Sequence, residues 1–211
     1  MSGVSVVTER EDFRDVAADA PPGGRVPIEV RVDVDDPFVA YRRARSGPGG
    51  VYLETTGGQP GWGYFGVDPT DRLRVGSEAV AVDGGSPSLA ALRGLLDAET
   101  LVRGDCDVPY PCGLFGWLSY DLARELESLP ESTVDDRGLP HLQVARFDVV
   151  AAWEAPRGTP TTLRITACPR VDDVDAAYDD ALDAATSLAR AATDGDPAVG
   201  APPTHAPAAQ F

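Results

Sequence analysis

Residues 109–130 read PYPCGLFGWLSYDLARELESLP and form the most distinctive segment of the chain. An apolar run broken by Gly113 and Gly116 predicts a strand over 114–119 whose glycines permit tight turns or close backbone approach. Tyr120 and Asp121 then resemble the start of a helix, expected over 121–129. The apolar density, with Trp117 at its centre, predicts that 113–130 is a buried strand-to-helix unit.

The segments on either side predict an α+β fold built from antiparallel β-sheets with peripheral helices. Strands are expected at 26–34, 51–54, 62–67, 142–153 and 162–167, and helices after Pro37, at 88–97 and at 171–192. The strands at 51–54 and 62–67 should form a hairpin, and so should those at 142–153 and 162–167. We expect one domain over residues 1–192, followed by a flexible linker or tail at 193–211.

The charge composition excludes several classes of function. The 211 residues include 18 basic and 34 acidic side chains, a formal net charge of -16, and every basic residue is an arginine. Without lysine there is no Walker A loop and no Schiff-base chemistry, and so acidic a surface repels nucleic acid. Abundant aspartate resembles salt-adapted archaeal proteins. Met1 to Asp15 contains no apolar run, so we expect no signal peptide, no membrane anchor and a cytoplasmic location.

Residue patterns that often mark chemistry have structural explanations here. Gly61, Gly63 and Gly66 spell G-x-G-x-x-G, but Asp68-Pro69 follows where a nucleotide loop needs a helix. The remaining candidates are the aspartate clusters 33–36 and 105–107, two histidines (His141 and His205) and three cysteines (Cys106, Cys112 and Cys168). The aspartate clusters could hold a divalent metal, but in so aspartate-rich a chain they are better explained as solvated surface. The histidines and cysteines lack the spacing of a zinc or nucleophile site, so we assign no catalytic and no metal-binding residue.

The central segment resembles one family. Its motif is similar to GG-x-x-G-x-x-x-YD-x-x-R-x-x-E-x-LP of component I of anthranilate synthase and of aminodeoxychorismate (para-aminobenzoate) synthase, with Cys112 in place of the first glycine. The matched positions are Gly113, Gly116, Tyr120, Asp121, Arg124, Glu127, Leu129 and Pro130. Residues 27–41, 52–55, 66–69, 139–140 and 147–148 agree with the family in order and spacing.

The resemblance implies the N-terminal, non-catalytic half of a chorismate-aminating enzyme, inactive alone. In the family, chorismate, magnesium and the acid-base residues belong to a separate chorismate-binding domain, and a glutamine amidotransferase subunit supplies ammonia. Family members often hold tryptophan in this half, which implies a pocket at Leu53, Glu54, Thr55 and Trp62. Glycines at 61 and 63 replace the family's arginine and serine, so we expect tryptophan binding no tighter than about millimolar.

The two branches of the family differ mainly in the other half. The short 55–61 gap, the altered pocket and the run at 124–131 favour aminodeoxychorismate synthase, on the path to folate. Anthranilate synthase, on the path to tryptophan, is the alternative. A stand-alone module that binds an aromatic amino acid, and an inert remnant or interaction module, also stay open.

Overall fold

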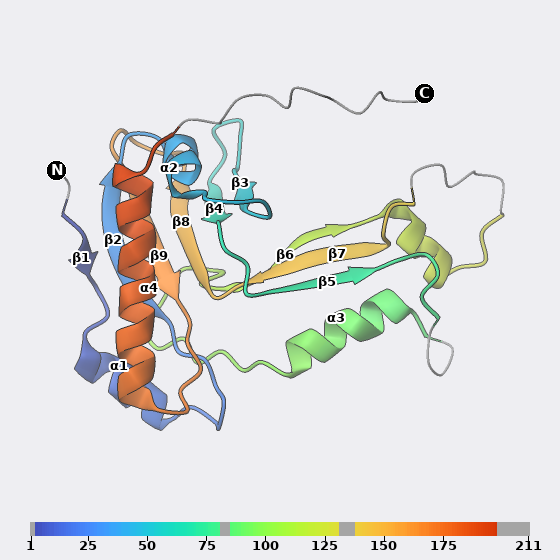
Figure 1. Ribbon diagram of the computed structural model, residues 1–211, viewed down its shortest axis with the longest axis horizontal. Helices are drawn as coiled ribbons and strands as arrows, with labels where there is room; N and C mark the ends of the chain where they lie inside the picture. The colour runs from blue at the N-terminus through green and yellow to red at the C-terminus, as the bar shows by residue number, and fades with distance from the viewer. Residues whose placement is uncertain (1–2, 81–84, 131–137, 198–211) are drawn as a thin grey trace.

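The computed structural model describes residues 3–80, 85–130 and 138–197, which form two antiparallel sheets (Figure 1). The larger sheet contains, in spatial order, β1 (Ser5–Val6), β2 (Ile28–Val34), β9 (Thr161–Ala167), β8 (Val149–Ala155), β4 (Gly61–Gly66) and β3 (Val51–Leu53). The smaller sheet contains β5 (Asp71–Val75), β7 (Leu142–Phe147) and β6 (Gly113–Leu118). The smaller sheet extends away from the larger one as an arm (Figure 1).

Helices pack against both sheets, which confirms the predicted α+β class. Three of them, α1 (Arg10–Ala18), α2 (Pro37–Ala44) and α4 (Val174–Asp194), lie with the larger sheet, whereas α3 (Pro87–Asp97) runs along the arm (Figure 1). The predicted helix after Pro37 is α2, and its N-terminus is capped as expected: the Asp36 carboxylate accepts from the N–H groups of Phe38 (2.7 Å) and Val39 (3.1 Å).

Helix α4 covers the main core because one of its faces carries small residues. Ala181, Ala185 and Ala189 are buried there, so the helix backbone approaches β2 and β9 closely. Tyr178 adds an edge-on contact with Phe13 of α1, with 5.5 Å between ring centroids. The aspartates lie on the solvent face of this helix, as the 171–192 pattern predicts.

The glycines of β4 are explained by the aromatic rings beneath them. A Cβ atom at Gly63 would lie 2.1 Å from the indole of Trp153, and one at Gly66 would lie 2.4 Å from the ring of Phe147. These glycines therefore allow a strand to pack against large rings. The β3–β4 hairpin is confirmed, and G-x-G-x-x-G is a strand rather than a nucleotide loop.

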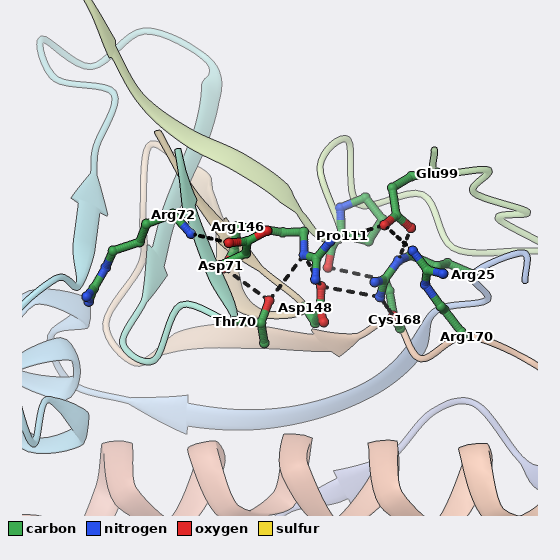
Figure 2. A network of polar contacts seen from close by, with 10 residues as sticks. All are labelled: Arg25, Thr70, Asp71, Arg72, Glu99, Pro111, Arg146, Asp148, Cys168 and Arg170. Carbon is green, nitrogen blue, oxygen red and sulfur yellow. Dashed lines mark hydrogen bonds and ion pairs between the residues drawn. The ribbon is translucent and has the colours of Figure 1, made fainter. Parts of the chain in front are cut away.

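The single strand predicted over 142–153 is wrong. The chain instead forms β7 and β8, which belong to different sheets and are separated by Asp148 alone. The Asp148 carboxylate lies 3.2 Å from Nη1 of Arg25 and 3.5 Å from Nε of Arg146. Figure 2 shows this junction, where Glu99 also binds both arginines and Arg170. The predicted hairpin with 162–167 exists, between β8 and β9.

The burial predicted for 113–130 is also wrong. The strand is present as β6, but Trp117 is 39 % exposed and Leu118 is 54 % exposed. The expected helix is shorter and of 3-10 type, η2 (Tyr120–Glu125), with Leu122 as its buried residue. Because β6 is an edge strand of the arm, apolar residues here do not imply a core position.

Three observed elements have no counterpart in the sequence prediction: β1, α1 and β5. The predicted tail begins inside α4, which continues to Asp194. Residues 198–211, with His205, lie outside the described residues, as does Glu131 of the 124–131 run.

Candidate functional site

A cavity of about 820 Å³ lies between the β3–β4 hairpin, the arm and α3. The four residues predicted for a tryptophan pocket, Leu53, Glu54, Thr55 and Trp62, all line this cavity. The structure therefore brings the predicted site residues together, and ligand binding itself stays a prediction. Other lining residues come from β4, α3, the 110–113 loop, β6 and β7: Tyr64, Leu92, Leu96, Tyr110, Cys112, Gly113, Leu114, Phe115, Gly116, Trp117, Leu118, Leu142 and Val144.

Aromatic rings form one wall of the cavity. Alternation along β4 places Trp62 and Tyr64 on one face, where their rings stack with 6.4 Å between centroids. Tyr64 also contacts Tyr110 at 5.9 Å and Phe115 at 6.1 Å. Planar apolar surfaces of this kind favour an aromatic ligand.

The hairpin connection holds Thr55 against β4. The Thr55 hydroxyl donates to the carbonyl oxygen of Trp62 (3.1 Å), so its proton is already engaged and only its lone pairs face other groups. A Cβ atom at Gly61 would lie 2.7 Å from the Thr55 hydroxyl oxygen. A side chain at 61 would therefore have to displace Thr55 from its hydrogen bond with Trp62.

Glu54 is the charged residue of the cavity wall. It accepts a hydrogen bond from the Tyr52 hydroxyl (3.1 Å) and lies 3.5 Å from Nε of Arg157. Arg157 is shared with Asp36, at 3.4 Å, so the three side chains together keep a net negative charge. The carboxylate keeps 27 % of its side-chain surface exposed and can receive a cation.

Tyr64 also lines the cavity, but it was not among the predicted binding residues. The residue is 6 % exposed, and its Oη has no hydrogen bond of normal geometry to any residue that the structure describes. Burial raises the pKa of Tyr64 to about 12, against a smaller opposite effect of the Tyr110 backbone N–H. The period-two alternation that places Trp62 on this face also places Tyr64 there, so the sequence pattern could have identified Tyr64 as a lining residue. The contribution of α3 had no local signal.

The carboxylates considered for metal binding serve the fold. Asp36 caps α2, Asp33 accepts from Thr162 (2.6 Å), and Asp107 pairs with Arg164. Across residues 3–80, 85–130 and 138–197, no three His, Cys, Asp or Glu side chains gather in a geometry that could hold a metal ion. In the same ranges, no helix has the length and apolarity needed to cross a membrane.

His141 belongs to a buried polar clamp rather than to a nucleophile site. Its Nδ1 lies 2.6 Å from Oε1 of Glu125, and the Ser88 hydroxyl donates to the same oxygen at 2.7 Å. The backbone N–H of Ser88 and the Ser86 hydroxyl donate to Oε2. Glu125 thereby ties η2 to the first turn of α3.

Comparison with curated proteins identifies the relatives of this arrangement. The chain is 62% identical over 210 residues to "Anthranilate synthase component 1 1" of Haloarcula marismortui. This alignment covers 98% of this chain and 42% of the relative. It is 53% identical over 214 residues to "Anthranilate synthase component 1 3" of the same organism (100% and 42%). The chain is a homologue of part of anthranilate synthase component 1. The similarity extends to the component 1 of Mycolicibacterium smegmatis, at 34% over 197 residues (86% and 37%).

These matches to anthranilate synthase component 1 confirm the resemblance inferred from residues 109–130. The chain spans about two fifths of the length of these relatives. No protein-family model matches the chain. The preference for the aminodeoxychorismate branch finds no specific support, and the relatives fit the anthranilate alternative better.

Proposed function

We propose that this chain is the non-catalytic half of a chorismate-aminating enzyme of the anthranilate synthase component 1 type. The observation that carries the proposal is 62% identity across 98% of the chain to a protein of that name, of which the chain spans 42%. Chorismate, magnesium and the acid-base groups would then belong to a chorismate-binding partner, and a glutamine amidotransferase subunit would supply ammonia. A cytoplasmic location follows from this role.

The apolar side of the arm supports a scaffolding role. Trp117, Leu118, Tyr120, Leu126 and Leu129 lie within 13 residues of each other and are each at least 39 % exposed. Five exposed large apolar side chains in so short a segment are more typical of an interface than of a free surface. We propose that the chorismate-binding partner covers it.

The test combines this chain with a separately expressed chorismate-binding region from the Haloarcula marismortui relative. With chorismate and ammonia in molar KCl, we expect no product from the chain alone and anthranilate, measured by its fluorescence, from the mixture. Trp117→Ala should weaken association of the two proteins, whereas Val6→Ala, an exposed change on β1, should not. Aminated product from the chain alone would overturn the proposal, and 4-amino-4-deoxychorismate from the mixture would place it in the other branch.

A further inference from the structure

Two of the three cysteines meet where the two sheets join. Cys112 directly precedes β6 of the arm, and Cys168 directly follows β9 of the larger sheet. The Cys168 thiol donates to the carbonyl oxygen of Pro111 at 3.5 Å and also forms a hydrogen bond with the Cys112 thiol. Figure 2 shows Cys168 beside Pro111, the residue before Cys112. The fold therefore pairs two thiols that lie far apart in the sequence.

Hydrogen bonds to the backbone hold this pair in place. The Thr166 hydroxyl donates to the Pro111 carbonyl oxygen at 2.6 Å, which fixes the loop that carries the first cysteine. On the other side, the Cys168 N–H donates to the Asp148 carbonyl oxygen at 2.9 Å. Nη1 of Arg25 donates to the carbonyl oxygen of Cys168 at 2.6 Å. The two sulfur atoms are therefore kept as neighbours by the same junction that joins the sheets.

The two thiols differ in accessibility and in acidity. Cys168 is 1 % exposed, whereas Cys112 is partly exposed and lines both the large cavity and a smaller one of about 210 Å³ beside Arg25. The hydrogen bond with Cys168 lowers the pKa of Cys112 against an opposite effect of burial, and the Arg25 cation adds to the lowering. The carboxylates of Asp148 and Glu99 offset part of the effect of Arg25. Burial raises the pKa of Cys168, so the accessible thiol is also the one that more readily becomes the reactive thiolate.

We propose that Cys112 and Cys168 are a redox modification site, at which a peroxide forms a reversible disulfide that ties the arm to the larger sheet. The Cys112 sulfur attacks one oxygen of hydrogen peroxide, the O–O bond breaks, and Cys112 becomes a sulfenic acid as one water leaves. The Cys168 sulfur then displaces the hydroxyl of the sulfenic acid, which leaves as a second water. The two thiols give up two electrons and two protons, the peroxide is reduced to two waters, and a dithiol reductant restores both thiols.

The position of the bond determines its effect. It would join the residue before β6 to the residue after β9, so one covalent link would connect the two sheets. A disulfide that closes a long loop stabilises a protein mainly by restricting its unfolded chain. We expect the thermal midpoint of the oxidised chain to lie about 5–10 °C above that of the reduced chain. This site goes beyond the proposed function, because it needs no ligand and no partner protein.

Treatment of the full chain with hydrogen peroxide in about 1 M KCl tests the proposal. Free thiols are counted in denaturant, and the intact mass is measured before and after the reaction. We expect the thiol count to fall from three to one and the mass to fall by about 2 Da, with both changes reversed by dithiothreitol. Three free thiols after a peroxide treatment that oxidises free cysteine would overturn the proposal. A gain of oxygen mass without loss of two hydrogens would overturn it as well.

Cysteine variants assign the two roles. Cys106→Ser, the matched control, should keep both the mass change and the rise in thermal midpoint, because burial raises the pKa of the Cys106 thiol and the pair does not include it. Cys112→Ser should abolish disulfide formation, and its reduced thermal midpoint checks that it folds. Cys168→Ala should leave a sulfenic acid on Cys112 that dimedone traps, because the second thiol is gone. A disulfide that survives in Cys112→Ser, or one that is lost in Cys106→Ser, would refute the assignment.

Discussion

Single charged side chains in this protein hold separate elements together. Glu125 is an example: its side chain is 6 % exposed, yet it is charged and fully engaged. Burial alone would raise its pKa, but hydrogen bonds from Ser86, Ser88 and His141 outweigh that effect and lower the pKa to about 2. A carboxylate held in this way stabilises the folded state only while it is ionised.

The contribution of Glu125 to stability depends on pH. Because its pKa falls from 4.5 in the unfolded chain to about 2, its contribution is complete above about pH 5 and is lost as the pH falls toward 2. We expect Glu125→Gln to lower the free energy of unfolding by on the order of 3 kcal/mol at pH 6 and by less than about half of that at pH 3. Urea denaturation in constant KCl measures both values. Glu127→Gln, an exposed change two residues away, is the control, and a gap that stays constant with pH would contradict the clamp.

Gly63 lies directly against the ring of Trp153. A methyl group there would overlap the Trp153 indole, so Gly63→Ala should destabilise the fold by roughly 1–3 kcal/mol. Gly47→Ala, where a Cβ would meet nothing within 4 Å, should stay within about 0.5 kcal/mol. Chemical denaturation compares the two. Combining Gly63→Ala with Trp153→Leu should recover part of the loss, and strictly additive effects would argue against the overlap.

Most strands and helices could be predicted from the sequence because the hydrophobic periodicity that marks each of them lies within its own residues. The alternation in 26–34 and the three-to-four spacing in α4 both follow directly from which face is buried. The break between β7 and β8 at Asp148 could not be predicted from periodicity, because apolar residues lie on both sides of it. Its ion-pair partner Arg25 lies over 100 residues away in the sequence. The four site residues were predicted from the family resemblance, whereas Leu92 and Leu96 were not predicted, because α3 reaches the cavity only through the tertiary fold.

Strand β6 shows how exposure changes an energetic expectation. Trp117 lies on the open edge of the arm and leaves no enclosed void when truncated, so Trp117→Ala should cost about 1–2 kcal/mol rather than the 3–5 kcal/mol expected for a core tryptophan. Trp153→Ala, at 1 % exposure, should cost about 3–5 kcal/mol. Equal losses in urea denaturation would mean that β6 is covered in solution.

Across the whole molecule, charge sets the conditions under which the fold is stable. The net charge of -16 acts against compaction, and the aspartates of α4 concentrate it on one surface. Salt at molar concentration shortens the screening length to about 3 Å and weakens this repulsion.

We therefore expect the thermal midpoint to climb by several degrees between about 0.1 M and 1 M KCl. Differential scanning calorimetry measures the midpoint, and a neutral osmolyte that leaves charge repulsion unscreened is the comparison. A flat or falling midpoint in KCl would show that the acidic surface does not limit stability.

The pairing of β2 with β9 also determines when this protein can fold as it is made. Ile28 pairs with Ala167, so β2 emerges from the ribosome long before the strand that it needs. At translation rates of about 5–20 residues per second, β2 waits on the order of ten seconds. During that interval the two-residue β1 is the one strand partner available to β2 among the described residues. The arm, whose strands and α3 lie between β2 and β9 in the sequence, can assemble first, and the larger sheet is completed once β9 has been made.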